Sequence, residues 1–182
     1  MNIIETPIKG LIIIEPKIFG DARGYFYESY QKKRYDEAGI KANFIQDNEA
    51  FSTYGVVRGL HFQKGEFAQA KLVRVLQGKV YDVAVDLRKN SPSYGEWYGV
   101  ELSEENKKQF FVPRGFAHGY SVMSETAIFA YKCDNDYNPQ SEGGINLNDE
   151  TLNIDWKIPV NKQLISDKDV ILPNIKDIIT DF

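Results

Sequence analysis

Hydrophobic residues in this chain fall in short blocks, where apolar positions alternate with polar ones or β-branched and aromatic residues follow one another. Gly, Pro, Asn and Asp separate the blocks, which is typical of many short β-strands. We predict ten strands, at residues 11–15, 25–29, 43–47, 57–63, 71–76, 80–87, 99–102, 109–112, 118–122 and 127–132. Ten short strands predict an all-β fold, built as a sandwich or a barrel.

The block at residues 80–87 shows the alternation most clearly. From position 81 onward its odd-numbered residues are Tyr, Val, Val and Leu, whereas its even-numbered residues include Asp82 and Asp86. Successive side chains of a strand point to opposite faces. We therefore expect this strand to contact a core on one face only.

Two other segments break the strand pattern. Residues 31–38 combine charges with helix-forming neighbours and are followed by Gly39, which predicts a short surface helix ending there. A second helix is possible near the C-terminus. Residues 134–144 contain Asn-Asp, Asn-Pro and Gly-Gly pairs and predict a long irregular connection, a kind of segment that often carries function.

Composition limits the class of protein. The 182 residues fit one domain, covering 1–182, and the formal net charge of -4 gives no field that attracts nucleic acid or an anionic membrane. A bound phosphate must therefore meet a local basic cluster. Cys133 is the only cysteine, so no internal disulfide can form, and a reducing cytoplasm is expected. The apolar run at residues 11–14 is too short for a membrane span.

The chain contains only two histidines. His61 would share a strand face with Gly59 and Gln63, and it is either a base or a structural histidine bonded to backbone groups. His118 follows a turn at residues 113–117, where either a turn-stabilising hydrogen bond or ligand binding would explain it.

The spacing of these histidines resembles the paired motifs of cupin barrels, with residues 55–63 as the first and Pro113-x-Gly115-x-x-His118 as the second. A metal cupin usually presents His-x-His plus Glu in the first motif. Here Gln63 occupies the second His position, and two histidines without a thiolate make a weak metal set. We therefore expect no bound metal, although Glu66 leaves a metal-dependent oxygenase or isomerase as an alternative.

Without metal, these residue types suit proton transfer at a carbon next to a ketone. Such a carbon needs a base positioned on its proton and a cation that stabilises the forming oxyanion. His61 is basic enough for the first task, and Lys71 could supply the charge, although a surface lysine is the ordinary alternative. Inversion also needs an acid on the opposite side, which Tyr131 could provide unless its role is packing.

Six motifs in order make nearly the whole chain resemble the dTDP-4-dehydrorhamnose 3,5-epimerase family. The motifs are Asp21-Ala-Arg-Gly-Tyr-Phe-Tyr-Glu28, Gln46-Asp-Asn48, residues 55–63, Lys71-Leu-Val-Arg74 with Asp82-Val-Ala-Val-Asp86, Pro113-Arg-Gly-Phe-Ala-His-Gly119, and Tyr131-Lys-Cys133 with Ser166-Asp-Lys-Asp169. The resemblance implies a cupin-type jelly roll, a homodimer, no cofactor, and a place in dTDP-rhamnose and cell-surface polysaccharide biosynthesis. The implied substrate is a dTDP-linked 4-keto-6-deoxyhexose that is inverted at carbons 3 and 5.

The resemblance also implies roles for single residues. His61 matches the base, Asp169 the carboxylate that orients it and raises its pKa, Tyr131 the proton donor, and Lys71 the enolate cation. Tyr137 matches the residue that stacks on thymine. The remaining candidates match positions that contact the nucleotide or sugar, or lie inside the second motif: Arg23, Glu28, Gln46, Asp47, Asn48, Arg58, His118, Glu142 and Lys168.

Some positions depart from the family pattern. Ala50 replaces a common serine, Asp136 a tyrosine before Tyr137, and Leu147 a frequent tryptophan, which affects nucleotide identity more than proton chemistry. Strand parity also puts Arg58 on the face opposite to the base, so a bulge or a strand end must intervene if both reach one ligand. Two further functions stay open: a relative that inverts only one carbon, and a sugar-nucleotide-binding module without chemistry.

Overall fold

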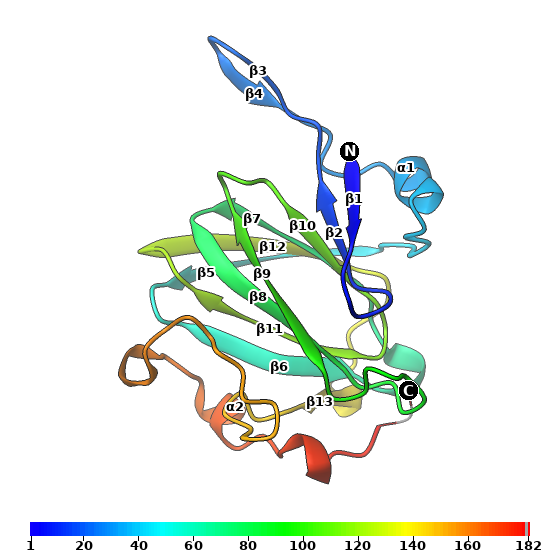
Figure 1. Cartoon of the computed structure of the whole chain (residues 1–182), viewed down its shortest axis with the longest axis vertical. Helices are drawn as coiled ribbons and strands as arrows, with labels where there is room; N and C mark the ends of the chain where they lie inside the picture. The colour runs from blue at the N-terminus through cyan, green and yellow to red at the C-terminus, as the bar shows by residue number, and fades with distance from the viewer. Residues whose placement is uncertain (181) are drawn as a thin grey trace.

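Two antiparallel sheets form a sandwich in this computed structural model, which describes residues 1–180 and 182 (Figure 1). The first sheet has the strand order β1 (Asn2–Glu5), β2 (Ile12–Glu15), β10 (Gln109–Val112), β7 (Lys71–Gln77), β12 (Thr126–Cys133) and β5 (Gln46–Thr53). The second has the order β13 (Glu142–Gly144), β6 (Val57–Gln63), β11 (Phe116–Val122), β8 (Lys79–Asp86) and β9 (Trp97–Ser103). The predicted all-β jelly-roll class is confirmed.

Helices are few and short. α1 (Lys32–Glu37) starts after Gln31, whose side chain accepts a hydrogen bond from the Arg34 amide, and Gly39 follows its end at φ +87°. The predicted helix at 31–38 is thus confirmed, and α2 (Asp167–Val170) is the second helix. The described residues also include four 3₁₀ turns, at η1 (Gly65–Phe67), η2 (Pro139–Ser141), η3 (Val160–Lys162) and η4 (Ile175–Asp177). Within the described residues, no helix is long and apolar enough to cross a membrane.

A third, two-stranded sheet stands apart from the sandwich. β3 (Phe19–Asp21) and β4 (Gly24–Phe26) form a hairpin that projects from one end of the molecule (Figure 1). The strand predicted at 25–29 is therefore wrong in extent, because only its first residues pair. All residues of the two strands are exposed.

β8 is buried on both faces, so the prediction of one-sided core contact is wrong. Val80 and Ala84 pack between the two sheets, whereas Val83 and Val85 pack on the outer face of the second sheet. Residues 145–178 cover that outer face with apolar side chains, among them Trp156, and Figure 1 shows this segment along the second sheet. The strand pattern alone could not reveal a cover supplied so much later in the chain.

The other strand predictions differ mainly at their ends. The limits of β6 and β10 match the prediction to the residue. The strand predicted at 43–47 is shifted, because β5 runs from Gln46 to Thr53 and pairs along its length with β12. β1, β3 and β13 were not predicted; β13 consists of Glu-Gly-Gly, which has no hydrophobic pattern.

A bulge in β6 resolves the parity conflict. His118 pairs with His61 and Tyr120 pairs with Arg58, so three steps along β6 oppose two steps along β11. Gly59 lies inside this bulge at φ +135°, and a Cβ added there would approach the Cα of Gly119 to 2.6 Å. The extra residue turns Arg58 toward the same side as His61.

Gly59→Ala should therefore lower the free energy of unfolding by about 3 kcal/mol, since it adds both a strained φ and a backbone clash. Gly24→Ala is the matched control, because Gly24 has φ +132° but no atom within 4 Å of an added Cβ. We expect the control to lose about 1 kcal/mol. Urea unfolding at one fixed protein concentration measures both, and equal losses would contradict the close-approach argument.

Candidate active site

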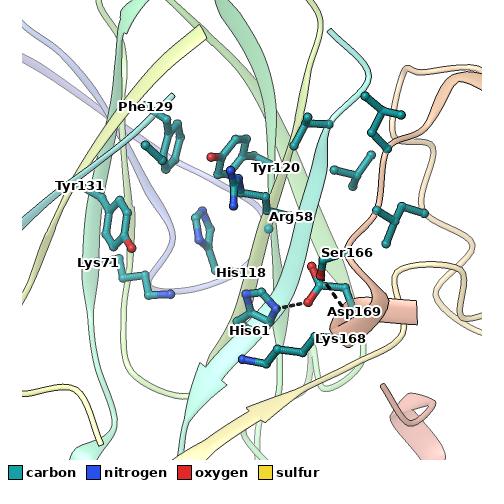
Figure 2. Close-up of a pocket in the computed structure, with 16 residues that line it drawn as sticks. Arg58, His61, Lys71, His118, Tyr120, Phe129, Tyr131, Ser166, Lys168 and Asp169 are labelled. Atoms are coloured by element: carbon teal, nitrogen blue, oxygen red, sulfur yellow. Dashed lines mark hydrogen bonds and ion pairs between the residues drawn. The ribbon is translucent and has the colours of Figure 1, made fainter. Parts of the chain in front are cut away.

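An open cavity of about 580 Å³ lies between the sheets and the C-terminal segment. The second sheet contributes His61 and His118, the first contributes Lys71 and Tyr131, and α2 contributes Asp169 (Figure 2). A second cavity of about 280 Å³ shares three of these residues, His61, Lys71 and Tyr131. The three therefore stand where the two cavities meet.

His61 and Asp169 form a pair across 108 positions of sequence. The Nε2 of His61 lies 2.7 Å from Oδ1 of Asp169, whose side chain is only 5% exposed. The Asp169 amide donates to the Ser166 hydroxyl, and Ser166 caps α2, which fixes the carboxylate in place. An ionised carboxylate accepts the Nε2 proton and leaves Nδ1 with the lone pair of a base.

The pKa of His61 is lowered from its ordinary value of 6.5, mainly because the imidazole is buried. The hydrogen bond and the charge of Asp169 raise this pKa, and the charge of Lys71 lowers it. Asp169 thus acts in the expected direction, but burial outweighs it. His61 is consequently neutral near pH 7, the form in which it can take a proton.

Lys71 opens β7 and faces the cavity without a carboxylate partner among the described residues. Burial lowers the pKa of its ammonium group, and the neighbouring Cys133, Asp82 and Glu142 side chains partly offset this effect. Its Nζ lies 5.9 Å from the ring centroid of Tyr131. A desolvated cation of this kind favours an anion that arrives with a ligand.

Tyr131 lies on β12 beside Lys71, and Figure 2 shows both on the wall facing His61. Burial is the main reason that the pKa of its hydroxyl is raised above 10.0. The hydroxyl therefore keeps its proton at neutral pH. This wall can donate a proton while the opposite wall removes one.

The pKa shifts predict the pH dependence of the base. His61 must be neutral to act, and its pKa is below 6.5, so kcat/KM should rise to its plateau with a midpoint below pH 6.5. Asp169→Asn should move the NMR titration midpoint of His61 lower still, since Asp169 raises this pKa, and Lys71→Met should move it higher. A chain with two histidines gives two resolvable ring signals for this measurement. Shifts of the opposite sign would contradict the assignment.

A cluster of polar residues lines the second cavity. Glu142 accepts hydrogen bonds from Lys168 Nζ at 2.7 Å and from the Tyr137 hydroxyl at 3.1 Å. These two bonds outweigh the effect of partial burial and lower the pKa of Glu142. Gln46 and Asn48 are hydrogen-bonded to each other at 2.9 Å on the neighbouring wall. Hydrogen-bond acceptors, hydrogen-bond donors and the exposed ring of Tyr137 therefore lie together at the second cavity.

Other predicted site residues lie elsewhere in this chain. Arg23 is at the tip of the projecting hairpin and pairs with Asp21. Glu28 pairs with Arg34 of α1. Asp47 does not line either of these two cavities; it alternates with Gln46 and Asn48 along β5, pairs with Lys132 and lines a separate hollow.

His118 lies in the predicted strand, although β11 begins at Phe116 rather than at His118, and β11 is the central strand of the second sheet. Its Nε2 lies 2.8 and 3.0 Å from the two carboxylate oxygens of Asp82, which is completely buried. Sequence reasoning missed Asp82 as a site residue. The available signal was an aspartate in the middle of an otherwise apolar strand.

The ligands that a metal cupin would need are not assembled. Gln63 donates to the carbonyl oxygens of Asp136 and Phe67 and accepts from the Asn138 amide, so its side chain holds the loop of residues 134–144. Glu66 is exposed on η1. In the described part of the chain, no group of three or more His, Cys, Asp or Glu residues is placed to bind a metal ion.

Comparisons with known proteins agree on one family. The sequence model described as dTDP-4-dehydrorhamnose 3,5-epimerase matches residues 5–177. The enzyme of that name from Shigella flexneri is 53% identical over 171 residues, covering 93% of each chain. The crystal structure from Elizabethkingia anophelis has 58% identity, a TM-score of 0.94 and 97% coverage of each chain. A Legionella pneumophila epimerase in complex with dTDP-4-keto-L-rhamnose has 52% identity and a TM-score of 0.94, covering 98% of this chain and 94% of the other.

Proposed function

We propose, from the premise that the chain belongs to the dTDP-4-dehydrorhamnose 3,5-epimerase family, that its cavity residues divide the work of a double epimerisation. The protein is an isomerase that converts dTDP-4-dehydro-6-deoxy-D-glucose to dTDP-4-dehydro-L-rhamnose. The observation that carries the assignment of roles is the His61–Asp169 pair facing Lys71 and Tyr131 across one cavity. The roles of these residues are our proposal.

The first step removes a proton from a carbon next to the ketone. Nδ1 of His61 takes the proton, the C–H electron pair forms a carbon–carbon double bond, and the carbonyl electrons move to the oxygen at carbon 4. The ammonium group of Lys71 then stabilises the enolate oxygen. Its partial desolvation strengthens this attraction relative to water.

The second step returns a proton to the opposite face of the planar enolate. The Tyr131 hydroxyl gives its proton to the carbon, and the carbonyl re-forms as the enolate electrons return. The tyrosinate and the imidazolium then exchange their proton through solvent, which resets both groups. A repeat at the second carbon on the other side of the ketone inverts that centre as well.

The nucleotide is proposed to bind at the second cavity. The exposed ring of Tyr137 suits stacking on thymine, and Gln46 and Asn48 offer amide groups to its edge. Arg58 and Lys168 would meet the pyrophosphate. These two residues form the local basic cluster that a phosphate needs in a chain whose net charge is -4.

A homodimer would explain the hairpin. Phe19, Tyr25 and Phe26 are 54%, 60% and 70% exposed, although Lys107 contacts the Tyr25 ring, and such exposure is unusual for large apolar side chains of a two-stranded sheet. We propose that the hairpin lies against a second copy and delivers Arg23 to the nucleotide cavity there. The chain is proposed to act in the cytoplasm and to supply cell-surface polysaccharide synthesis.

Mixing Arg23→Ala subunits, which bind substrate weakly, with inactive His61→Asn subunits tests this exchange. Arg23→Ala should raise KM roughly tenfold, because it removes a cation from the pyrophosphate. His61→Asn subunits keep Arg23, so a mixed dimer with Arg23→Ala subunits would regain one complete site, and kcat/KM should rise on mixing. Arg34→Ala is the control, since Arg34 lies on α1 outside the hairpin and should leave KM unchanged. Absence of any gain on mixing would contradict an exchanged hairpin.

Turnover in deuterated water tests the function itself. With dTDP-4-dehydro-6-deoxy-D-glucose, mass spectrometry and proton NMR should find deuterium at both carbon 3 and carbon 5. Label at one carbon would favour the single-inversion alternative, and label at neither would overturn the proposal. Activity should also survive a chelator, whereas stoichiometric metal with chelator-sensitive activity would favour a metal cupin.

A further inference from the structure

The sugar cavity contains a second imidazole–carboxylate pair that the mechanism above does not use. His118 and His61 are direct cross-strand partners on β11 and β6, so the two imidazoles lie side by side on one sheet face. Each has its own carboxylate, Asp82 for His118 and Asp169 for His61. Figure 2 shows His118 deeper in the cavity, between His61 and the aromatic wall.

Asp82 is poorly explained as a stabilising residue. It is 0% exposed, and among the described residues the imidazole of His118 is its only side-chain hydrogen-bond partner. Burial raises the pKa of Asp82, and the interaction with His118 and the charge of Lys71 only partly oppose this. A buried carboxylate with one partner is costly, and an apolar side chain of similar size would often be more stabilising.

Asp86 on the same strand shows what a stabilising carboxylate looks like here. It is equally buried, but it accepts hydrogen bonds from Arg88, Ser91 and Ser93. These bonds outweigh burial and lower the pKa of Asp86 to about 2. The contrast indicates that Asp82 is held at its position for the sake of His118.

Resting on the proposed function, we infer that Asp82 is a positioning residue that fixes His118 so that its Nδ1 accepts a hydrogen bond from a hydroxyl group of the keto sugar. The ionised carboxylate accepts the Nε2 proton, which leaves a lone pair on Nδ1. That nitrogen has no partner among the described residues, and His118 lines the cavity. Holding the sugar ring at a second point would keep carbons 3 and 5 each within reach of the base.

The test compares Asp82→Asn with Asp86→Asn, two variants of buried carboxylates on one strand. Asp82→Asn should lower kcat roughly 10- to 100-fold, leave the affinity for dTDP unchanged, and alter the ratio of deuterium at carbons 3 and 5. Asp86→Asn should lower Tm but keep kcat and the label ratio in the folded protein. A folded Asp82→Asn enzyme with wild-type kcat and label ratio would overturn the inference, whereas a wild-type enzyme that labels neither carbon would overturn the proposed function instead.

Nitrogen-15 NMR of the wild-type enzyme tests the proposed orientation of His118 even if Asp82→Asn does not fold. The His118 ring should carry its proton on Nε2, and the Nδ1 resonance should shift when dTDP-glucose binds but not when dTDP binds. Protonation at Nδ1 in the neutral ring, or the same response to both ligands, would refute the inference.

Discussion

His61→Asn is expected to lower kcat roughly 1,000-fold or more while dTDP binds as tightly as to the wild type, since a positioned general base contributes up to about four orders of magnitude. The asparagine amide can still contact Asp169 but cannot take a proton at neutral pH. Because the nucleotide is proposed to bind at the second cavity, its affinity depends on Tyr137, Glu142 and Lys168. Single-turnover assays and calorimetry with dTDP measure the two effects separately.

His118→Asn is the matched control for this variant, because it removes the other imidazole of the same sheet face. It should lower kcat by far less than His61→Asn, since a hydrogen bond to the sugar is lost but the base remains. Deuterium exchange should vanish in His61→Asn and persist in His118→Asn. Equal losses of exchange, or wild-type turnover in His61→Asn, would refute the assignment of the base.

Tyr131→Phe should lower epimerisation roughly 100-fold or more and yet leave proton removal in place. His61 would still take the proton and form the enolate, but only His61 could return one, and it would do so to the original face. Deuterium from the solvent should therefore enter the substrate without inversion. Proton NMR of the sugar separates the two results, because exchange removes a signal whereas inversion changes the coupling constants.

Tyr120→Phe provides the control, since Tyr120 lines the same cavity, stacks on Phe129 with ring centroids 4.1 Å apart, and lies on β11 of the second sheet, whereas the proposed acid lies on the first. It should retain the ratio of inversion to exchange. If Tyr131→Phe kept that ratio as well, another group would have to be the acid.

The hydrophobic pattern predicted the positions of the strands better than it predicted which faces of the sheets are buried. β6 and β10 end at breaks in the apolar pattern, so their limits could be predicted. β5 lacks this pattern over residues 48–53 because it is an edge strand with much of one face exposed, and its extent was missed. The second core outside β8 needs Leu152 and Trp156, which nothing local to β8 indicates.

The site followed from the sequence only where a family resemblance joined distant segments. His61 and Asp169 are 108 positions apart, and no periodicity connects them. The bulge at Gly59 could be deduced from the sequence. A regular strand would put Arg58 and His61 on opposite faces, whereas the family resemblance implies that both contact the same ligand. The net lowering of the pKa of His61 could not be deduced, because it depends on how deeply segments from both sheets bury the imidazole.

Residues 145–178, which cover the outer face of the second sheet, are synthesised after the strands that they cover. Translation delivers β6, β8 and β11 before residues 145–178, so a growing chain has an uncovered apolar surface until its last part emerges. Asp169 arrives with that same part. The orienting carboxylate of the base and the protection of the sheet from aggregation are therefore acquired together, and an unfinished chain has neither.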